Sequence, residues 1–179
     1  MPSVRYVSRG LIDGSLSILG VVLGAAVGGD VKVIIAAGLG GGIANCLSNV
    51  FGALTAERAA IMADLKKTEE DLVGSDVRLK DTKIYTNQKN RILQGGALDG
   101  LFTFIGSTVP IAPFLLVGRL VDLETAILLS VAVTLLLLFV LGVYLGKLSK
   151  ENILISGSKL ALFGLITAII ASSLEFFFR

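Results

Sequence analysis

Long apolar runs, separated by short polar stretches, make up most of this 179-residue chain. A helix of about 20 apolar residues crosses the hydrocarbon core of a bilayer, and a helix satisfies its own backbone hydrogen bonds there. The pattern therefore predicts an all-α integral membrane protein with five transmembrane helices, in a single transmembrane domain over 1–179. The predicted spans lie near 10–28, 33–56, 95–117, 126–146 and 158–178.

Residues 57–92, between the second and third spans, break the apolar pattern with seven acidic and eight basic side chains. A helix facing lipid would not tolerate this charge density, so we expect a helical hairpin in water, inserted in the transmembrane domain. The first half of the segment favours helix, Gly74-Ser75 is a natural stop, and Asp76 is placed to cap a second arm over 77–93. The first arm is mainly acidic and the second mainly basic, so we expect them to pair by charge.

Basic residues predict the direction of insertion, because cytoplasmic loops carry an excess of Lys and Arg. Thirteen of the 16 Lys and Arg residues fall on the side of the N-terminus and the predicted hairpin, and only Lys32, Arg119 and Arg179 fall on the other. We therefore expect a multi-pass protein of the cell membrane, with the N-terminus and hairpin cytoplasmic and the C-terminus external.

Composition excludes several classes of function. Charged residues make up 17% of the chain, against about 25% in soluble domains, and the net charge of +2 is too small to indicate a nucleic-acid partner. With no His and a single Cys, Cys46, the chain offers no zinc site, disulfide or His-activated nucleophile. We expect no enzyme, and any metal chemistry would use oxygen ligands with at most two Met thioethers.

The sequence also contains an internal repeat. The segment Gly10–Gly20 matches Gly96–Gly106, and both have the pattern G-x-x-D-G-x5-G. Two predicted helices separate the start of one copy from the start of the other, so the first and third spans should run in the same direction. This indicates a parallel duplication of a two-helix unit, with the fifth helix added.

Each copy of the repeat places one acidic residue inside a span, Asp13 in the first and Asp99 in the third. A buried intramembrane acid is costly and is a functional-site hypothesis by default. The alternative is that each carboxylate, about one turn into its helix, interacts with the positive N-terminal end or caps nearby amides. We favour this second explanation for Asp99 and the functional one for Asp13, because polar residues continue into the span beside Asp13.

Those polar residues are Ser17 on the first span and Asn45, Ser48 and Asn49 on the second, the last three sharing one helical face. They are typical of close helix packing among small residues, and equally of a polar ion path. A carboxylate with amide and hydroxyl oxygens suits Mg²⁺, Mn²⁺ or Fe²⁺ rather than copper. Both interpretations stay open.

Two further patterns have two interpretations each. Pro110 and Pro113 are expected to break the third span, and this break marks either a packing kink or the wall of a cavity. On the hairpin, acids recur every seven residues along one face, and a solvated, salt-bridged face is favoured over metal capture. The hairpin residues that would serve metal capture are Glu57, Met62, Asp64, Glu69 and Glu70.

Three motifs together resemble the vacuolar iron transporter family. They are Asp13-Gly14, the stretch 47–52 (LSNVFG) leading to Ala56-Glu57, and 106–116 (GSTVPIAPFLL), which is similar to the family signature G-x3-P-x2-P-[FY]-L-L. The resemblance implies five spans and a homodimer in the lipid bilayer. It also implies export of ferrous iron or manganese from the cytoplasm in exchange for protons, along a path between the subunits.

Carried over residue by residue, the resemblance places the family's first-span aspartate on Asp13. The second-span methionine falls on Asn49 and the second-span glutamate on Gly41, so two ligand positions differ. The first hypothesis is a divalent-metal transporter that holds no permanent cofactor and couples to protons through Asp13, since metal and proton compete for one carboxylate. The alternative is a non-transporting scaffold or partner-binding subunit that keeps the fold after losing its ion site.

Overall fold

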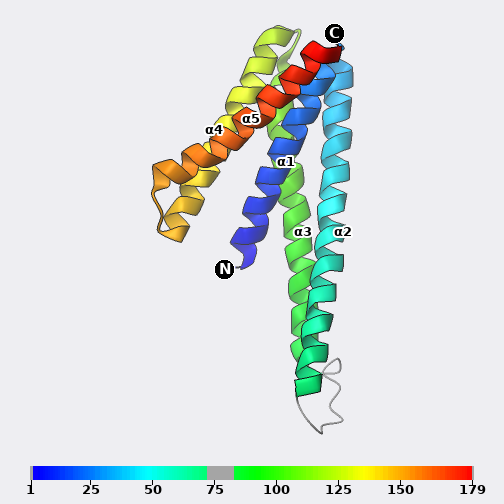
Figure 1. The fold of residues 1–179 in the computed structure, drawn as a ribbon. Coiled ribbons are helices and arrows are strands. Elements are labelled where there is room, and N and C mark those ends of the chain that lie inside the picture. The colour runs from blue at the N-terminus through cyan, green and yellow to red at the C-terminus, as the bar shows by residue number, and fades with distance from the viewer. Residues whose placement is uncertain (1, 72–82, 179) are drawn as a thin grey trace.

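The computed structural model of the chain describes residues 2–71 and 83–178. Within them the chain is helical apart from short connections (Figure 1). Five helices are long and apolar enough to cross a membrane, which confirms the predicted all-α multi-pass protein. The elements are α1 (Pro2–Ala26), α2 (Val31–Asp71), α3 (Lys83–Ile111), the 3-10 helix η2 (Ala112–Leu116), α4 (Leu123–Ser149) and α5 (Ile153–Phe178).

The helices alternate in direction along the chain. In Figure 1, α1, α3 and α5 run toward the end of the molecule that holds the C-terminus, while α2 and α4 run back. The repeat-bearing helices α1 and α3 are therefore parallel and packed against each other, as the duplication predicted. At the turn between α1 and α2, Gly29 adopts a φ of +69°, and the Asp30 carboxylate accepts a hydrogen bond of 2.8 Å from the Lys32 amide.

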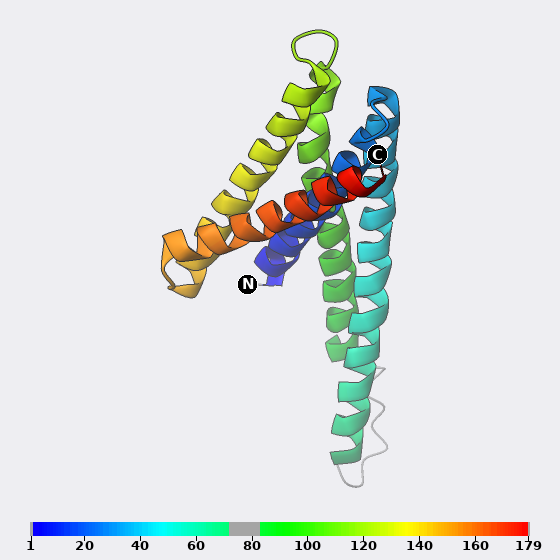
Figure 2. The same cartoon turned by 45° about the horizontal axis from the view of Figure 1, so that its top comes forward.

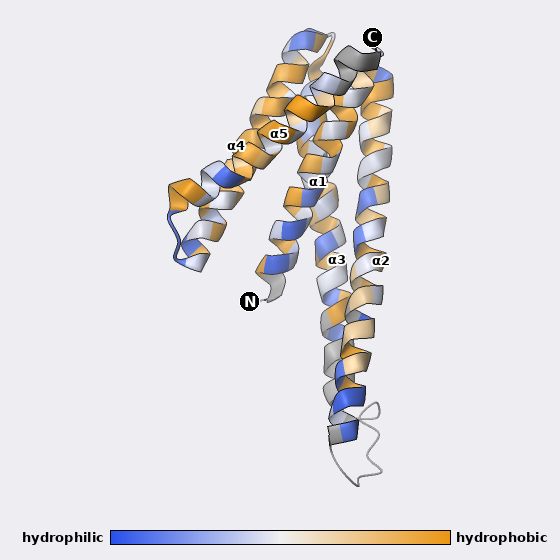
Figure 3. Ribbon diagram, viewed as in Figure 1, coloured by the Kyte–Doolittle hydropathy of each residue, from blue (hydrophilic) through white to orange (hydrophobic). Residues whose placement is uncertain are grey.

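Helix α2 is a single helix of 41 residues, about 60 Å long at 1.5 Å per residue. The predicted second span and the first helical arm expected after it are continuous through residue 56, because no Gly or Pro lies within 53–60 to stop the helix. The part of α2 after residue 56 lies beside the first turns of α3 (Figures 1 and 2). Hydrophilic positions are concentrated in this part of α2 (Figure 3). The predicted stop at Gly74-Ser75 and the cap at Asp76 lie outside the described residues.

Glycines let α1 and α3 approach closely. A Cβ on Gly10 would lie 2.5 Å from the Asp99 carbonyl oxygen, and one on Gly106 would lie 2.6 Å from the Leu11 carbonyl oxygen. A Cβ on Gly14 would collide with the Thr103 carbonyl oxygen. Gly10, Gly14 and Gly106 of the repeat are thus positions where the two backbones meet, as in small-residue interfaces of membrane helices.

The apolar core lies toward the opposite end of α1 from its N-terminus. Ile18 and Val22 of α1 pack there with Ile34 of α2 and Phe114 of η2. A second cluster joins α1 to α5 through Leu19, Leu23, Ala168 and Ala171. The first cluster also includes Ile111 of α3 and Ala126 of α4, so these contacts join all six elements at this end.

The two prolines end α3 rather than breaking it. The helix continues through Pro110 to Ile111, and the chain then tightens into η2, which contains Pro113. The Ser130 hydroxyl of α4 donates a hydrogen bond of 2.7 Å to the Pro110 carbonyl. Both prolines are buried, which favours the packing interpretation over a cavity wall.

Helices α4 and α5 form a hairpin, which lies farther from α1 toward the α4–α5 turn (Figures 1 and 2). Gly142 and Gly146 of α4 contact Ser156 of α5, and Lys150 takes a φ of +57° at the end of α4. At the start of α4, the Thr125 hydroxyl donates a hydrogen bond to the exposed Asp122 carboxylate. This hydrogen bond holds the pKa of Asp122 below its usual value. Large apolar side chains on the outer faces are exposed, as expected for contact with lipid.

Candidate functional site

Both intramembrane acids lie well inside their helices. Helix α1 begins at Pro2 and α3 at Lys83, so Asp13 and Asp99 are several turns from the first turn of either helix. Only the first four amides of a helix lack partners, so neither carboxylate can cap them. The helix-end explanation favoured for Asp99 is therefore wrong, because polar residues extend both helices beyond the predicted spans.

Asp99 is instead neutralised by an arginine from α1. Its side chain is fully buried, and Nε of Arg9 donates to both carboxylate oxygens, at 3.2 and 3.1 Å, while Nη2 bonds to Oδ2. The Arg9 side chain is 46% exposed, so the charge pair reaches from the α1–α3 contact to the surface. A buried carboxylate needs such a partner.

Asp13 has a different environment. It is half-buried, and its described hydrogen-bond donors are both uncharged. Asn49 of α2 donates from Nδ2 to Oδ2 at 2.6 Å, and the Ser17 hydroxyl lies 3.5 Å from Oδ1. The two acids are related by the repeat, but their surroundings differ. One carboxylate is bound at both oxygens by a guanidinium, and the other accepts hydrogen bonds from uncharged donors.

A chain of hydrogen bonds joins the two acids. The Asn49 amide also donates to the Thr103 hydroxyl oxygen at 2.8 Å, and that hydroxyl donates to the Asp99 backbone carbonyl at 2.7 Å. Thr103 stands where the repeat places Ser17 in the first copy. Sequence reasoning missed both Thr103 and Arg9, and the signal for Thr103 was its match to Ser17 in the repeat.

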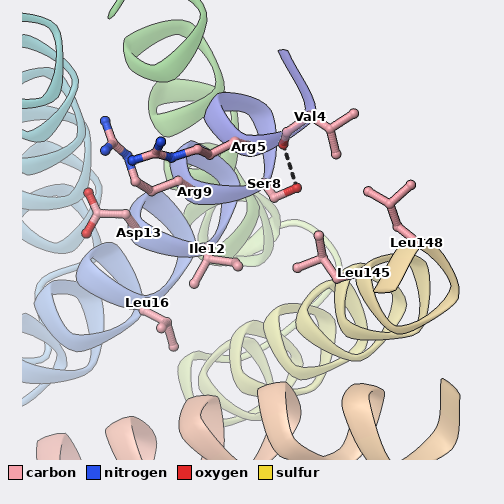
Figure 4. Close-up of a pocket in the computed structure, with 9 residues that line it drawn as sticks. All are labelled: Val4, Arg5, Ser8, Arg9, Ile12, Asp13, Leu16, Leu145 and Leu148. Carbon is pink, nitrogen blue, oxygen red and sulfur yellow. Dashed lines mark hydrogen bonds between the residues drawn. The ribbon is translucent and has the colours of Figure 1, made fainter. Parts of the chain in front are cut away.

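Asp13 borders two hollows. One, of about 510 Å³, lies between α1 and α2 and is lined by Arg5, Arg9, Asp13 and Asn49 with the small residues Gly52, Ala53, Ala56 and Ala60. The other, of about 590 Å³, lies between α1 and the end of α4 (Figure 4). Its apolar wall consists of Val4, Ile12, Leu16, Leu145 and Leu148.

The remaining residues predicted for the ion path differ in exposure and in hydrogen bonding. Ser48 is exposed and does not join Asp13, although Asn49 beside it does. Asn45 is half-buried, and its Nδ2 is buried with no hydrogen-bond partner. Because buried donors are nearly always satisfied, this amide marks a position suited to a water or another polar group. Gly41 faces α1, where a Cβ would lie 3.0 Å from Ile18 Cδ1.

The hairpin residues show no metal cluster where the structure describes them. Asp64 and Glu70 are exposed, Met62 is half-buried, and Glu70 pairs with Lys66 at 3.8 Å. The side chains of Glu57 and Glu69 lie outside the described residues. Over the described part of the chain, no three Cys, Asp or Glu side chains come close enough to hold a metal ion together.

The fold and site define a multi-pass membrane protein with a carboxylate placed within its helices beside a polar cavity. Residues 51–174 match the VIT family. An uncharacterized protein of Methanocaldococcus jannaschii is 47% identical over 171 residues, which cover 96% of this chain and 87% of that protein. The chain belongs to the VIT family, whose members are membrane transporters rather than enzymes, and this confirms the resemblance seen in its motifs.

Proposed function

We propose that this chain transports a divalent metal cation, Fe²⁺ or Mn²⁺, and that Asp13 is the group that receives it. The observation that carries the proposal is the half-buried Asp13 carboxylate, which borders the cavity between α1 and α2 and, among the described residues, accepts hydrogen bonds from uncharged donors only. A carboxylate inside a membrane span with no charged partner attracts a cation strongly.

The ligand chemistry favours a hard or borderline cation. Asp13 supplies a carboxylate, Ser17 a hydroxyl and Asn49 an amide beside it, and oxygen ligands suit Mn²⁺ and Fe²⁺. The site contains no His or thiolate. The methionine and glutamate that the family pattern expects are replaced by Asn49 and Gly41, so one chain provides only part of a coordination shell.

A second copy of the chain would complete the shell. In the proposed homodimer, each protomer contributes its Asp13 to a path between the subunits. Support comes from Gly40 and Gly52 of α2, where an added Cβ would meet nothing within 4 Å. Small positions of this kind allow a helix of another protomer to approach closely.

The proposed direction is export from the cytoplasm in exchange for protons. The distribution of Lys and Arg supports a cytoplasmic hairpin and N-terminus, and Arg5, near the N-terminus, lines the cavity beside Asp13. Hairpin carboxylates, among them Asp64 and Glu70, would concentrate the cation there. A proton and a metal ion compete for Asp13, and this competition provides the coupling.

Transport into proteoliposomes tests the proposal. Full-length chain is reconstituted with an internal metal-sensitive dye, and Mn²⁺ or Fe²⁺ uptake is followed with and without a pH gradient. We expect wild-type uptake that the gradient accelerates, and a loss of about 100-fold or more in Asp13→Asn, which removes the charge. Asp122→Asn removes an exposed acid before α4 and serves as the matched control.

Two results contradict the proposal. Wild-type chain that binds and moves neither metal would favour the non-transporting scaffold. Uptake by Asp13→Asn at the wild-type rate would show that the cation takes another path.

A further inference from the structure

One guanidinium stands within reach of both acids of the repeat. Arg9 precedes Asp13 by four residues on α1, and side chains with this spacing lie on the same helix face. Figure 4 shows the Arg9 and Asp13 side chains extending to the same side of α1, and both line the cavity between α1 and α2. The Arg9 guanidinium, however, is bonded to both carboxylate oxygens of Asp99.

The two carboxylates compete for this cation, and burial decides the outcome. Asp99 is 0% exposed, so leaving it without a partner would strand a charge in the protein interior. Asp13 is half-buried and already accepts hydrogen bonds from Asn49 and Ser17. A guanidinium bound in bidentate fashion to Asp99 has a fixed orientation, and it therefore does not occupy the oxygens of Asp13.

We propose that Asp99 is a positioning residue for the cation site: it holds Arg9 against α3 and so keeps the Asp13 carboxylate open to a divalent cation. This inference rests on the proposed function, because it concerns cation binding at Asp13. A metal ion and a guanidinium need the same carboxylate oxygens. Without the Asp99 charge, Arg9 becomes a competitor tethered one helical turn from the site.

The proposal also explains why the repeat keeps two acids with different surroundings. The hydrogen bonds Asp13–Asn49–Thr103–Asp99 fix the spacing between them. One acid is paired with the permanent positive charge of an arginine. The other is left to bind the exchangeable cation.

Equilibrium binding of Mn²⁺ to the purified full-length chain in detergent tests the inference. The electron paramagnetic resonance signal of free Mn²⁺ reports the Kd without any transport. We expect Asp99→Asn to raise the Kd about 10-fold or more, because Arg9 is then released toward Asp13. Asp99→Asn combined with Arg9→Gln should bring the Kd back to within about 3-fold of wild type, since the competitor is gone.

A matched control separates this effect from a general change in charge. Arg5 lines the same cavity but is exposed, and no ion pair with Asp99 is described for it. Asp99→Asn with Arg5→Gln carries the same net charge as the rescuing pair, yet its Kd should stay as weak as that of Asp99→Asn. Equal rescue by Arg5→Gln and Arg9→Gln would overturn the inference, and so would an unchanged Kd in Asp99→Asn.

Folding is followed by size-exclusion chromatography and thermal unfolding of each variant. If Asp99→Asn does not fold, Arg9→Lys provides the second test. It keeps the charge but loses the bidentate fork, so Mn²⁺ binding should weaken, and a wild-type Kd would overturn the inference. Wild-type chain that binds neither Mn²⁺ nor Fe²⁺, or full metal binding by Asp13→Asn, overturns the proposed function itself.

Discussion

Asn49 connects three helices at the site. Its Nδ2 donates to Asp13 Oδ2 and to the Thr103 hydroxyl oxygen, so a single amide joins α1, α2 and α3. The family pattern expects a methionine at this position, and here a polar group orients the acid instead. The hydrogen bond from Asn49 thus orients the Asp13 carboxylate.

Replacing Asn49 with leucine keeps the side-chain volume but removes both hydrogen bonds. A hydrogen bond to a charged group is worth about 1.5–3 kcal/mol, so we expect Mn²⁺ affinity to fall at least about 10-fold. The same titration on Thr55→Ala is the control, because this exposed hydroxyl on α2 bonds only to its own helix backbone. An Asn49→Leu chain that binds as tightly as wild type would exclude the orienting role.

The Arg9–Asp99 pair also contributes to stability. Arg9→Gln leaves the buried Asp99 without its cation, and breaking a buried pair in this way costs about 3–5 kcal/mol. We expect a lower midpoint of thermal unfolding in detergent, with most of the loss recovered when Asp99→Asn is added. Arg5→Gln removes an exposed charge and should change stability by less than about 0.5 kcal/mol. Equal midpoints for Arg9→Gln and Arg5→Gln would contradict this.

At the scale of elements, the repeat is a packing motif first. Its glycines bring backbone against backbone where α1 meets α3, and the two acids come with them to the same crossing. Gly100 plays the same part toward α2, since a Cβ there would collide with Val50 and lie 3.1 Å from the Cys46 carbonyl oxygen. The repeat thus places Asp13 and Asp99 close together because it places small residues beside them.

A pair of glycine substitutions on one helix tests this packing. Gly14→Ala puts a methyl group into the Thr103 carbonyl oxygen, whereas Gly24→Ala meets nothing within 4 Å. Overpacking costs about 1–3 kcal/mol, so Gly14→Ala should unfold at a lower temperature in detergent, and Gly24→Ala should not. If both variants kept the wild-type midpoint, the close α1–α3 contact would be contradicted.

For the whole molecule, the described residues contain five helices able to cross a membrane, and an odd number of crossings would put the two termini on opposite sides. The basic residues near the N-terminus and at the α4–α5 turn lie toward one end of the bundle, and the α1–α2 and η2–α4 connections lie toward the other (Figures 1 and 3). The protein therefore has one strongly basic end, and the Asp13 cavity, with its two arginines, lies on that side.

Labelling of introduced cysteines checks this orientation. In a Cys46→Ala background, a membrane-impermeant maleimide added to intact cells should label Arg119→Cys, on the connection before α4. It should label Ser149→Cys, at the end of α4, only after the membrane is permeabilised. Both positions are exposed, so a reversed pattern would mean that the chain is inserted the other way and that the proposed direction of transport is wrong.

The sequence by itself determined the five membrane-spanning helices, the charged segment between the second and third, and the parallel repeat. These follow from local constraints, because each span in lipid must be apolar and must satisfy its own backbone. The membrane family was also recognisable from its short motifs. The starts of two helices were predicted less well, because polar residues extend α1 and α3 beyond the predicted spans.

Only the tertiary structure decided which acid is neutralised. The sequence places Asp13 and Asp99 in identical motifs, and the partner of Asp99 is Arg9, a residue 90 positions away. Likewise Asn49 reaches Asp13 while Ser48 beside it is exposed, because the rotation of α2 is set by packing against α1 and α3. Local pattern fixes which segments are apolar enough to enter the membrane, but the contacts between helices fix which carboxylate is paired with an arginine.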